Sequence, residues 1–147
     1  MKTLTLTQPW ATLVAIGAKS AETRSWYTNH RGPIAIHAAK AYPVDCRSLV
    51  SQPAFLQALN KGSYSVSTPL PRGVVLCTAT LVACVGIDGD DETTREMLAA
   101  FEIPPHPEIE FGNYEAGRFA WILKNVVPVI PPLPAKGMLR LWEWNQP

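Results

Sequence analysis

Three ionisable side chains of both signs lie close together early in the chain, at Lys19, Glu22 and Arg24. If Ser20–Trp26 forms a β-strand, its period of two places Glu22 and Arg24 on the same face as Trp26, in steps of about 6.5–7 Å. A carboxylate, a guanidinium and an indole then line one polar pocket, with Lys19 at its corner. The alternative is a solvated surface ion pair, with Lys19 capping the carbonyl end of the preceding helix.

The flanking segments predict the elements that hold this strand. Gln8-Pro9-Trp10 is typical of a helix start, because proline is favoured in the first helical turn, and Gly17 is typical of a helix end. Residues 3–7 alternate between threonine and leucine, as in a strand with one buried face. We therefore expect a strand, a helix and a second strand in succession.

Arg31, His37 and Lys40 are further ligand-binding candidates, because they lie in the same stretch as the charged cluster. The strand predicted over Pro33–Ala38 has isoleucines on one face and His37 on the other. At that position His37 either reaches a ligand or is a hydrogen-bonded structural histidine.

Five tryptophans in 147 residues provide a second clue to function. Base–aromatic stacking contributes roughly 1–3 kcal/mol per base, so an indole beside Arg and Lys suits a single-stranded or flipped nucleotide. Large aromatic side chains also dominate protein cores. We expect Trp26 to face the pocket, and Trp10 and Trp121 to lie in the core.

The rest of the chain predicts a single α+β domain over residues 1–147, a small mixed or antiparallel β-barrel with helices packed against it. We expect a helical region over Ala41–Asn60, broken at Pro53, and a long strand over Val74–Ile87. An acid-capped helix follows Asp88–Asp91. The chain then continues as a strand over Phe119–Val127, a polyproline-like segment over Pro128–Pro134 and a closing strand over Met138–Trp144. Glu102–Gly117 has no periodicity and contains three prolines, so we expect an irregular flap beside the pocket.

Composition excludes several broad classes. The chain is 47% hydrophobic and 17% charged, as in ordinary globular domains, and shows neither a leader-like apolar segment nor a run long enough to span a membrane. Three cysteines without clustered spacing are typical of reduced thiols, so we expect a cytoplasmic protein. With no C-x-x-C pair and three scattered histidines, we expect no metal site and no cofactor.

The net charge of +1 conceals an uneven distribution. Residues 1–40 contain five basic side chains and one acidic one, whereas residues 86–115 contain nine carboxylates and one arginine. Proteins that coat long nucleic acids are usually basic overall or along a face. Any nucleic-acid binding is therefore expected to involve a few nucleotides or a single base.

The stretch from Gln8 to Lys40 contains the pattern Gly17-x-Lys19-x-x-Glu22-x-Arg24, preceded by Gln8-Pro9-Trp10-Ala11 and followed by Trp26, Arg31-Gly32-Pro33 and Ile36-His37-Ala38. This combination resembles the ASCH (activating signal cointegrator homology) family of the PUA-like superfamily. The resemblance returns at Phe119-Ala120-Trp121, at Lys136-Gly137 and at Leu141-Trp142, and so covers nearly the whole chain. It implies a pseudobarrel whose family motif lines a cleft between barrel and helices.

The resemblance also implies RNA-related work. PUA-like domains commonly bind RNA, and one branch of the family hydrolyses the acetyl group of N4-acetylcytidine with a lysine, a threonine and a glutamate. The lysine of that branch corresponds to Lys19, but its threonine corresponds to Glu22, which cannot serve as a hydroxyl nucleophile. Thr23 is adjacent and on the opposite strand face, which makes it a poor substitute.

Three functions follow from these residues. The first is a module that binds RNA or a modified nucleobase through the candidate residues Lys19, Glu22, Arg24, Trp26, Arg31, His37 and Lys40. The second is a metal-independent hydrolase on a nucleoside or RNA, amidohydrolase-like or ribonuclease-like, with Glu22 as general base and Lys19 stabilising an oxyanion. The third is a protein-interaction module that uses the acidic helix and the proline-rich segment.

Overall fold

The computed structural model describes all residues of the chain, 1–147. The strands are β1 (Lys2–Leu6), β2 (Ala21–Arg24), β3 (Gly32–Ala38), β4 (Val74–Gly86), β5 (Phe119–Pro134) and β6 (Leu141–Glu143). The helices are α1 (Trp10–Ala15), α2 (Val44–Ser48), α3 (Pro53–Lys61), α4 (Asp91–Ala100) and α5 (Pro105–Phe111), with a 3-10 turn over Leu49–Ser51. None of the helices is long and apolar enough to cross a membrane.

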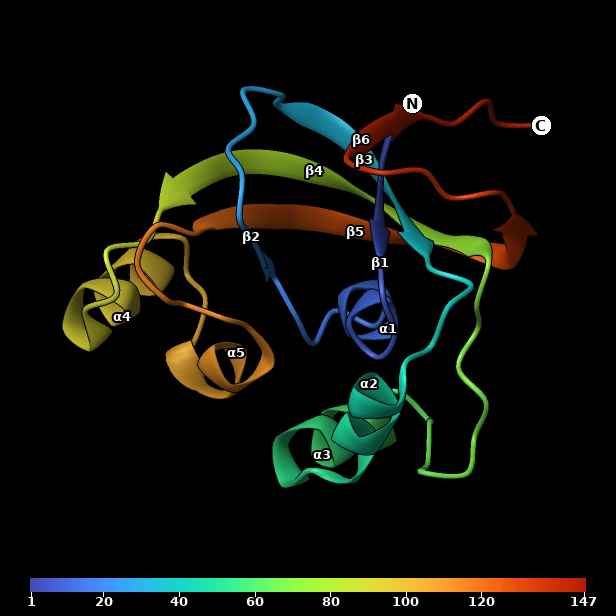
Figure 1. Ribbon diagram of the computed structural model, residues 1–147, viewed down its shortest axis with the longest axis horizontal. Coiled ribbons are helices and arrows are strands. Elements are labelled where there is room, and N and C mark those ends of the chain that lie inside the picture. Colours follow the sequence, from blue (N-terminus) through green and yellow to red (C-terminus); the bar gives the residue numbers. More distant parts are fainter.

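The strands form one mixed sheet in the order β2-β5-β4-β3-β1-β6, in which only β1 and β3 pair in parallel. The sheet curves into a half-barrel, and the helices lie together on one side of it (Figure 1). Helix α1 fills the hollow and contacts β1, β3, β4 and β5. The predicted α+β class, a small mixed barrel-like sheet with helices packed against it, is confirmed, although the barrel is open, with β2 and β6 as its edges.

Strand parity explains where the core lies. Leu4, Leu6, Ile34 and Ile36 are at most 1% exposed and pack with the buried face of α1. Fully burying a side chain of this kind contributes roughly 1.5–3 kcal/mol. On the opposite face of the same strands, a smaller cluster gathers around Trp142.

Helix α1 begins and ends where the sequence predicted. It starts at Trp10, directly after Pro9, and Gly17 adopts a φ of +80°, a left-handed conformation that favours glycine. The Gln8 side chain bridges the helix to a distant loop, since it donates to the Pro71 carbonyl at 2.7 Å and accepts from the Thr12 amide at 3.0 Å.

Helix α4 also matches its prediction. The Asp90 carboxylate accepts a hydrogen bond from the Thr93 amide at 2.9 Å and so caps the first turn. Asp91, Glu92 and Glu96 are exposed on this helix, which is the acidic surface of the protein-interaction hypothesis.

The segment Glu102–Gly117 does lie beside the predicted pocket, but the expectation that it is irregular is wrong. The segment contains α5, and its Glu108 and Phe111 are buried at 3% and 1% exposure. It is held because Glu108 accepts hydrogen bonds from backbone amides of the Ser20–Ala21 segment, 87–88 residues away. Such a long-range contact leaves no periodic pattern in the sequence.

The expected polyproline-like segment Pro128–Pro134 is instead the second half of β5, which continues to Pro134. Strand β2 pairs only with Phe119–Ile122 of β5, so the later part of β5 has β4 on one side and no strand on the other. Prolines fit in that half because an edge strand needs amide donors on one side only.

Candidate functional site

The predicted polar pocket is a cleft of about 400 Å³ where β2, the start of α1, α3 and the end of α5 meet. We call it the motif cleft. Its lining includes Trp10, Glu22, Arg24, Gln52, Asn113 and Arg118. Glu22 and Arg24 therefore share one face of β2 and one cavity, as strand periodicity predicted.

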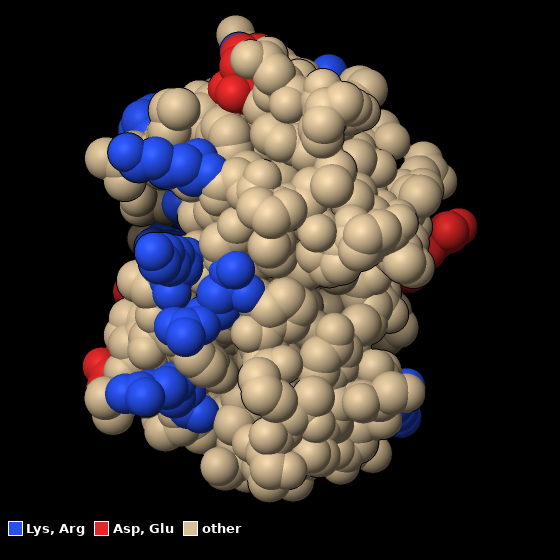
Figure 2. Space-filling model, turned by 90° about the vertical axis from the view of Figure 1, so that its right-hand side faces the viewer, with Lys and Arg blue, Asp and Glu red and all other residues tan.

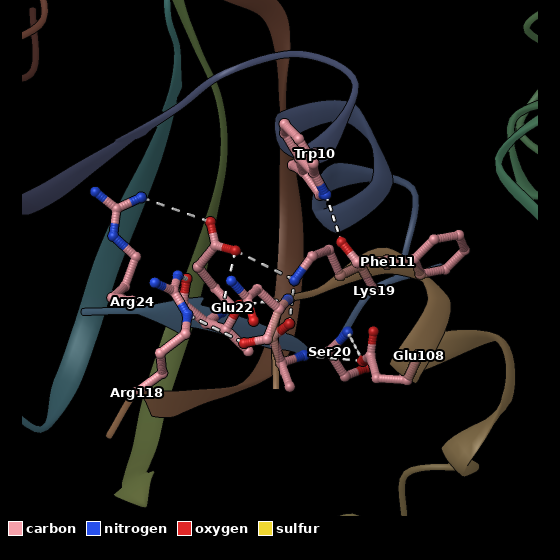
Figure 3. A network of polar contacts seen from close by, with 11 residues as sticks. Trp10, Lys19, Ser20, Glu22, Arg24, Glu108, Phe111 and Arg118 are labelled. Carbon is pink, nitrogen blue, oxygen red and sulfur yellow. Dashed lines mark hydrogen bonds and ion pairs between the residues drawn. The ribbon is translucent and has the colours of Figure 1, made fainter. Parts of the chain in front are cut away.

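Glu22 lies at the centre of an ion-pair cluster (Figure 3). Its Oε1 is 3.3 Å from Lys19 Nζ, and its Oε2 is 3.8 Å from Arg24 Nη1. The side chains of Lys19 and Glu22 are 0% and 9% exposed, whereas that of Arg24 is 28% exposed. The alternative of a solvated surface pair is therefore wrong: two opposite charges are buried, and such charges need each other.

Lys19 lies beneath the cleft and does not line it. Its ammonium donates to the Ala21 carbonyl as well as pairing with Glu22. The donors of Lys19 are thus directed into the protein, where the lysine anchors Glu22 and the start of β2.

A second carboxylate, Glu108 of α5, supports the cluster from the other side. Its Oε1 accepts hydrogen bonds from the amides of Ser20 and Ala21, at 2.9 Å for the latter, while its Oε2 has no partner. Burial raises the pKa of Glu108, and the nearby Lys19 charge and the backbone hydrogen bonds oppose this rise. Glu108 does not line the cleft, so its role there is to hold β2 and α5 together.

The remaining wall of the cleft is tied to β2 by two hydrogen bonds and is held together by a third. The Thr23 hydroxyl accepts from the Asn113 amide at 3.1 Å, and Arg118 donates to the carbonyls of Thr23 and Asn113, both at 3.1 Å. The Thr23 hydroxyl is thus already engaged. The guanidinium of Arg24 makes no hydrogen bond within the chain beyond its 3.8 Å ion pair, so its donors remain free for a ligand.

Trp10 and Trp26 do not lie where we expected them, since Trp10 lines the cleft and Trp26 packs away from it. Trp10 lines the motif cleft, and its indole N–H donates to the Phe111 carbonyl. Trp26 packs edge-on against Trp121 at 4.6 Å between ring centroids and is covered by Arg140, whose guanidinium carbon lies 4.2 Å from the Trp26 centroid. Trp26 is therefore not at the rim of the cleft, because β2 ends at Arg24 and the chain turns there. Trp121 is fully buried, as predicted.

The other predicted ligand-binding residues lie outside the motif cleft. Arg31 is exposed and donates to the carbonyls of Thr28 and His30 in the loop before β3. His37 is 1% exposed and hydrogen-bonds through both ring nitrogens, so it is a structural histidine. Lys40 lines a separate cavity with His37.

The sequence did not predict three residues of the site, namely Trp10 as part of the cleft wall, Arg118 and Glu108. The signal for Trp10 was present, because it opens a helix whose other end leads to Lys19. Arg118 and Glu108 reach β2 across sequence separations of 95 and 87 residues, for which the sequence offers no local signal.

Comparison with known proteins agrees with this architecture. A family model described as the ASCH domain matches residues 4–133. Activating signal cointegrator 1 from Homo sapiens is 28% identical over 142 residues, and its Mus musculus counterpart is 27% identical over 140. Each match covers 95% of this chain and 22% of the relative, so the chain spans about a fifth of those proteins.

Among solved structures, a crystal structure of a mutant ASCH protein from Zymomonas mobilis superimposes with a TM-score of 0.50 at 18% identity. The match covers 90% of this chain and 74% of that one, and it shows a shared fold. Because the family model spans most of the residues, including the whole ion-pair cluster, the chain belongs to the ASCH domain family.

Proposed function

We propose that the motif cleft binds a single nucleobase, presented by RNA or as a modified nucleoside. The observation that carries this proposal is the buried carboxylate of Glu22, which opens into the cleft beside the free donors of Arg24 and the ring of Trp10. The RNA-related work that the ASCH resemblance implies favours the same reading.

Each group has a defined task in this proposal. Glu22 accepts hydrogen bonds from an exocyclic amino group, as acidic side chains do with N4 of cytosine. Arg24 donates to a base carbonyl or a neighbouring phosphate. The N–H of Trp10 is already used by Phe111, so its ring is left to contact the base. A volume of about 400 Å³ is within the range of small-molecule sites.

The hydrolase alternative has weaker support in this geometry. It requires Lys19 to stabilise an oxyanion and Glu22 to activate water, but the Lys19 ammonium is buried and committed to Ala21 and Glu22. A carboxylate paired with two cations is better suited to accepting hydrogen bonds than to removing protons.

A reducing compartment such as the cytoplasm is the setting that we propose, since the three cysteines are free thiols.

The test is binding of a panel of unmodified and modified nucleosides by calorimetry, with mass spectrometry of the same mixtures for products. Uncharged nucleosides isolate the cleft from phosphate contacts. We expect Glu22→Gln and Arg24→Ala each to weaken binding about tenfold or more, since each removes a charge-assisted hydrogen bond worth about 1.5–3 kcal/mol. The matched controls are Glu96→Gln and Arg95→Ala on α4, which are exposed and lie outside the cleft.

Binding that is equal in the cleft variants and the control variants would contradict the proposal. Turnover by the wild type, lost in a folded Glu22→Gln variant that still binds normally, would replace the binding reading with the hydrolase reading.

A further inference from the structure

A second and larger cavity lies at the end of the sheet where β4 begins and β5 ends. Its volume is about 920 Å³, and it shares no lining residue with the motif cleft. Lys40, Arg72 and Lys136 line it, and no carboxylate does. We call it the cation pocket. Figure 2 shows a band of basic side chains down this side of the molecule.

The cations of this pocket have few partners of their own. Arg72 donates from Nη1 to the Lys40 carbonyl at 3.0 Å, and its guanidinium carbon lies 5.8 Å from the centre of the Tyr42 ring. These two contacts orient its remaining donors. The ammonium groups of Lys40 and Lys136 have no hydrogen bond or ion pair within the chain. Three like charges thus surround one cavity without a counter-charge.

A hydrogen-bonded chain fixes the floor of the pocket. Trp142 Nε1 donates to the Thr5 hydroxyl at 3.0 Å, the hydroxyl contacts His37 Nδ1 at 3.2 Å, and His37 Nε2 contacts the Ala135 carbonyl at 2.7 Å. Because a carbonyl can only accept, His37 Nε2 carries a proton and Nδ1 accepts from Thr5. This arrangement attaches the segment after β5 to β1 and β3.

Gly137 explains how Lys136 is held at the rim. A Cβ at this position would lie 2.7 Å from His37 Cε1 and 2.9 Å from the Thr5 hydroxyl oxygen. Only glycine allows the backbone to lie so close to the imidazole. One pocket is therefore built from two segments about a hundred residues apart in the sequence. His37 and Lys40 come from the first segment, and Lys136 and Gly137 come from the second.

We propose that the cation pocket is a phosphate-binding site that takes the phosphate group of a nucleotide, either within a single strand or as a free mononucleotide. Lys and Arg donors match phosphate oxygens, and Arg can bind two of them at once. The cavity is larger than one phosphate requires, and the exposed side chains of Met138 and Leu139 beside it offer apolar contact to the rest of the nucleotide. The proposal does not depend on base binding in the motif cleft.

The test compares Lys40→Gln/Lys136→Gln with Lys61→Gln/Arg95→Gln, two variants that lose the same charge. Lys61 and Arg95 are exposed and lie outside the cation pocket. Binding of a short single-stranded oligoribonucleotide and of adenosine 5′-monophosphate is measured by anisotropy and calorimetry across a salt series. For the oligonucleotide, the pocket variant should lose about tenfold or more in affinity at low salt, with a salt slope shallower by about 1.4, or about 0.7 for each lost contact.

The two probes separate the possible sources of the phosphate. A loss confined to the oligonucleotide assigns the pocket to a strand, and an equal loss for the monophosphate assigns it to a free nucleotide. If the pocket variant and the control variant bind both probes alike, the inference is overturned. Uncharged nucleosides test the motif cleft alone, so failure of one proposal is distinguishable from failure of the other.

Discussion

The motif cleft and the cation pocket handle charge in opposite ways. At the motif cleft, Glu22 is paired with the buried Lys19 beneath it, and Glu108 is close by. In the pocket, Lys40 and Lys136 are exposed and unpaired. Buried ions destabilise a fold unless each is matched, whereas exposed ions cost little to leave open. The comparison therefore teaches that a charge offered to a ligand in the first region depends on a buried partner that also holds the fold together, whereas the charges of the second region have no such structural partner.

The strongest test of the comparison is removal of the buried cation. Lys19→Met leaves Glu22 without its buried partner, so we expect the free energy of unfolding to fall by about 3–5 kcal/mol in urea denaturation. Adding Glu22→Gln should restore part of the loss, because the uncompensated charge disappears. The control is Lys2→Met, which breaks an exposed ion pair with Glu143 and should change stability by less than about 1 kcal/mol. Equal losses in the two lysine variants would refute the distinction.

The floor of the cation pocket should be the next most sensitive feature. Gly137→Ala forces a methyl group against His37 and Thr5, and we expect a loss of about 1–3 kcal/mol from overpacking. Oligonucleotide affinity should fall with it, since Lys136 must move, while nucleoside affinity at the motif cleft stays the same. Gly86→Ala is the control, because its Cβ would meet nothing closer than 4.0 Å. A loss of nucleoside affinity in Gly137→Ala would mean that the two regions are coupled.

A smaller effect is expected from pH. Burial lowers the pKa of His37 below its usual 6.5, and the hydrogen bond to the Ala135 carbonyl opposes this only in part. The unfolded chain therefore takes up a proton near pH 6.5 before the folded chain does, so stability is full above pH 6.5 and declines as the pH falls toward the folded value. Unfolding curves between pH 7.5 and 5 should show this decline in the wild type. His37→Gln should flatten it, and an unchanged slope would show that His37 does not titrate in this range.

The smallest effect on the unfolding free energy is expected from the lysines of the cation pocket. Lys40→Gln/Lys136→Gln should leave the unfolding free energy within about 0.5 kcal/mol of the wild type, because neither ammonium has a partner to lose. Relief of repulsion with Arg72 favours a slight gain. A loss similar to that of Lys19→Met would show that these lysines are structural, and it would be read from the same denaturation series.

The sequence was informative wherever the determining contacts are local. The period of two within β2 was enough to bring Glu22 and Arg24 into one cleft, and Pro9 and Gly17 were enough to delimit α1. The sequence was uninformative wherever partners come from distant segments. Trp26 looked available for a ligand because nothing near it in the chain shows that Arg140 stacks on its ring.

The same limit explains why the sequence did not predict the structural role of Glu108. Glu108 lies in a proline-rich stretch with many carboxylates, and nothing local marks it as the one that binds the amides of Ser20 and Ala21. Its burial depends on the position of α5, which contacts α3 and α4 and brings Glu108 to the amide of Ala21 at the start of β2. The cation pocket was equally hidden, since Lys40 and Lys136 meet only after β1, β3 and β5 have assembled.

The prolines of β5 have a consequence for how this domain meets other copies of itself. The half of β5 beyond Leu123 is an edge for other chains to pair with, and it exposes Val127 and Ile130 at 58% and 86%. Long apolar edges of this kind invite strand addition and aggregation. Prolines at positions 128, 131, 132 and 134 remove amide donors from this stretch, which leaves fewer for an incoming strand to use. The prolines that make this segment look unlike a strand in the sequence thus also oppose the pairing of its edge with a second molecule.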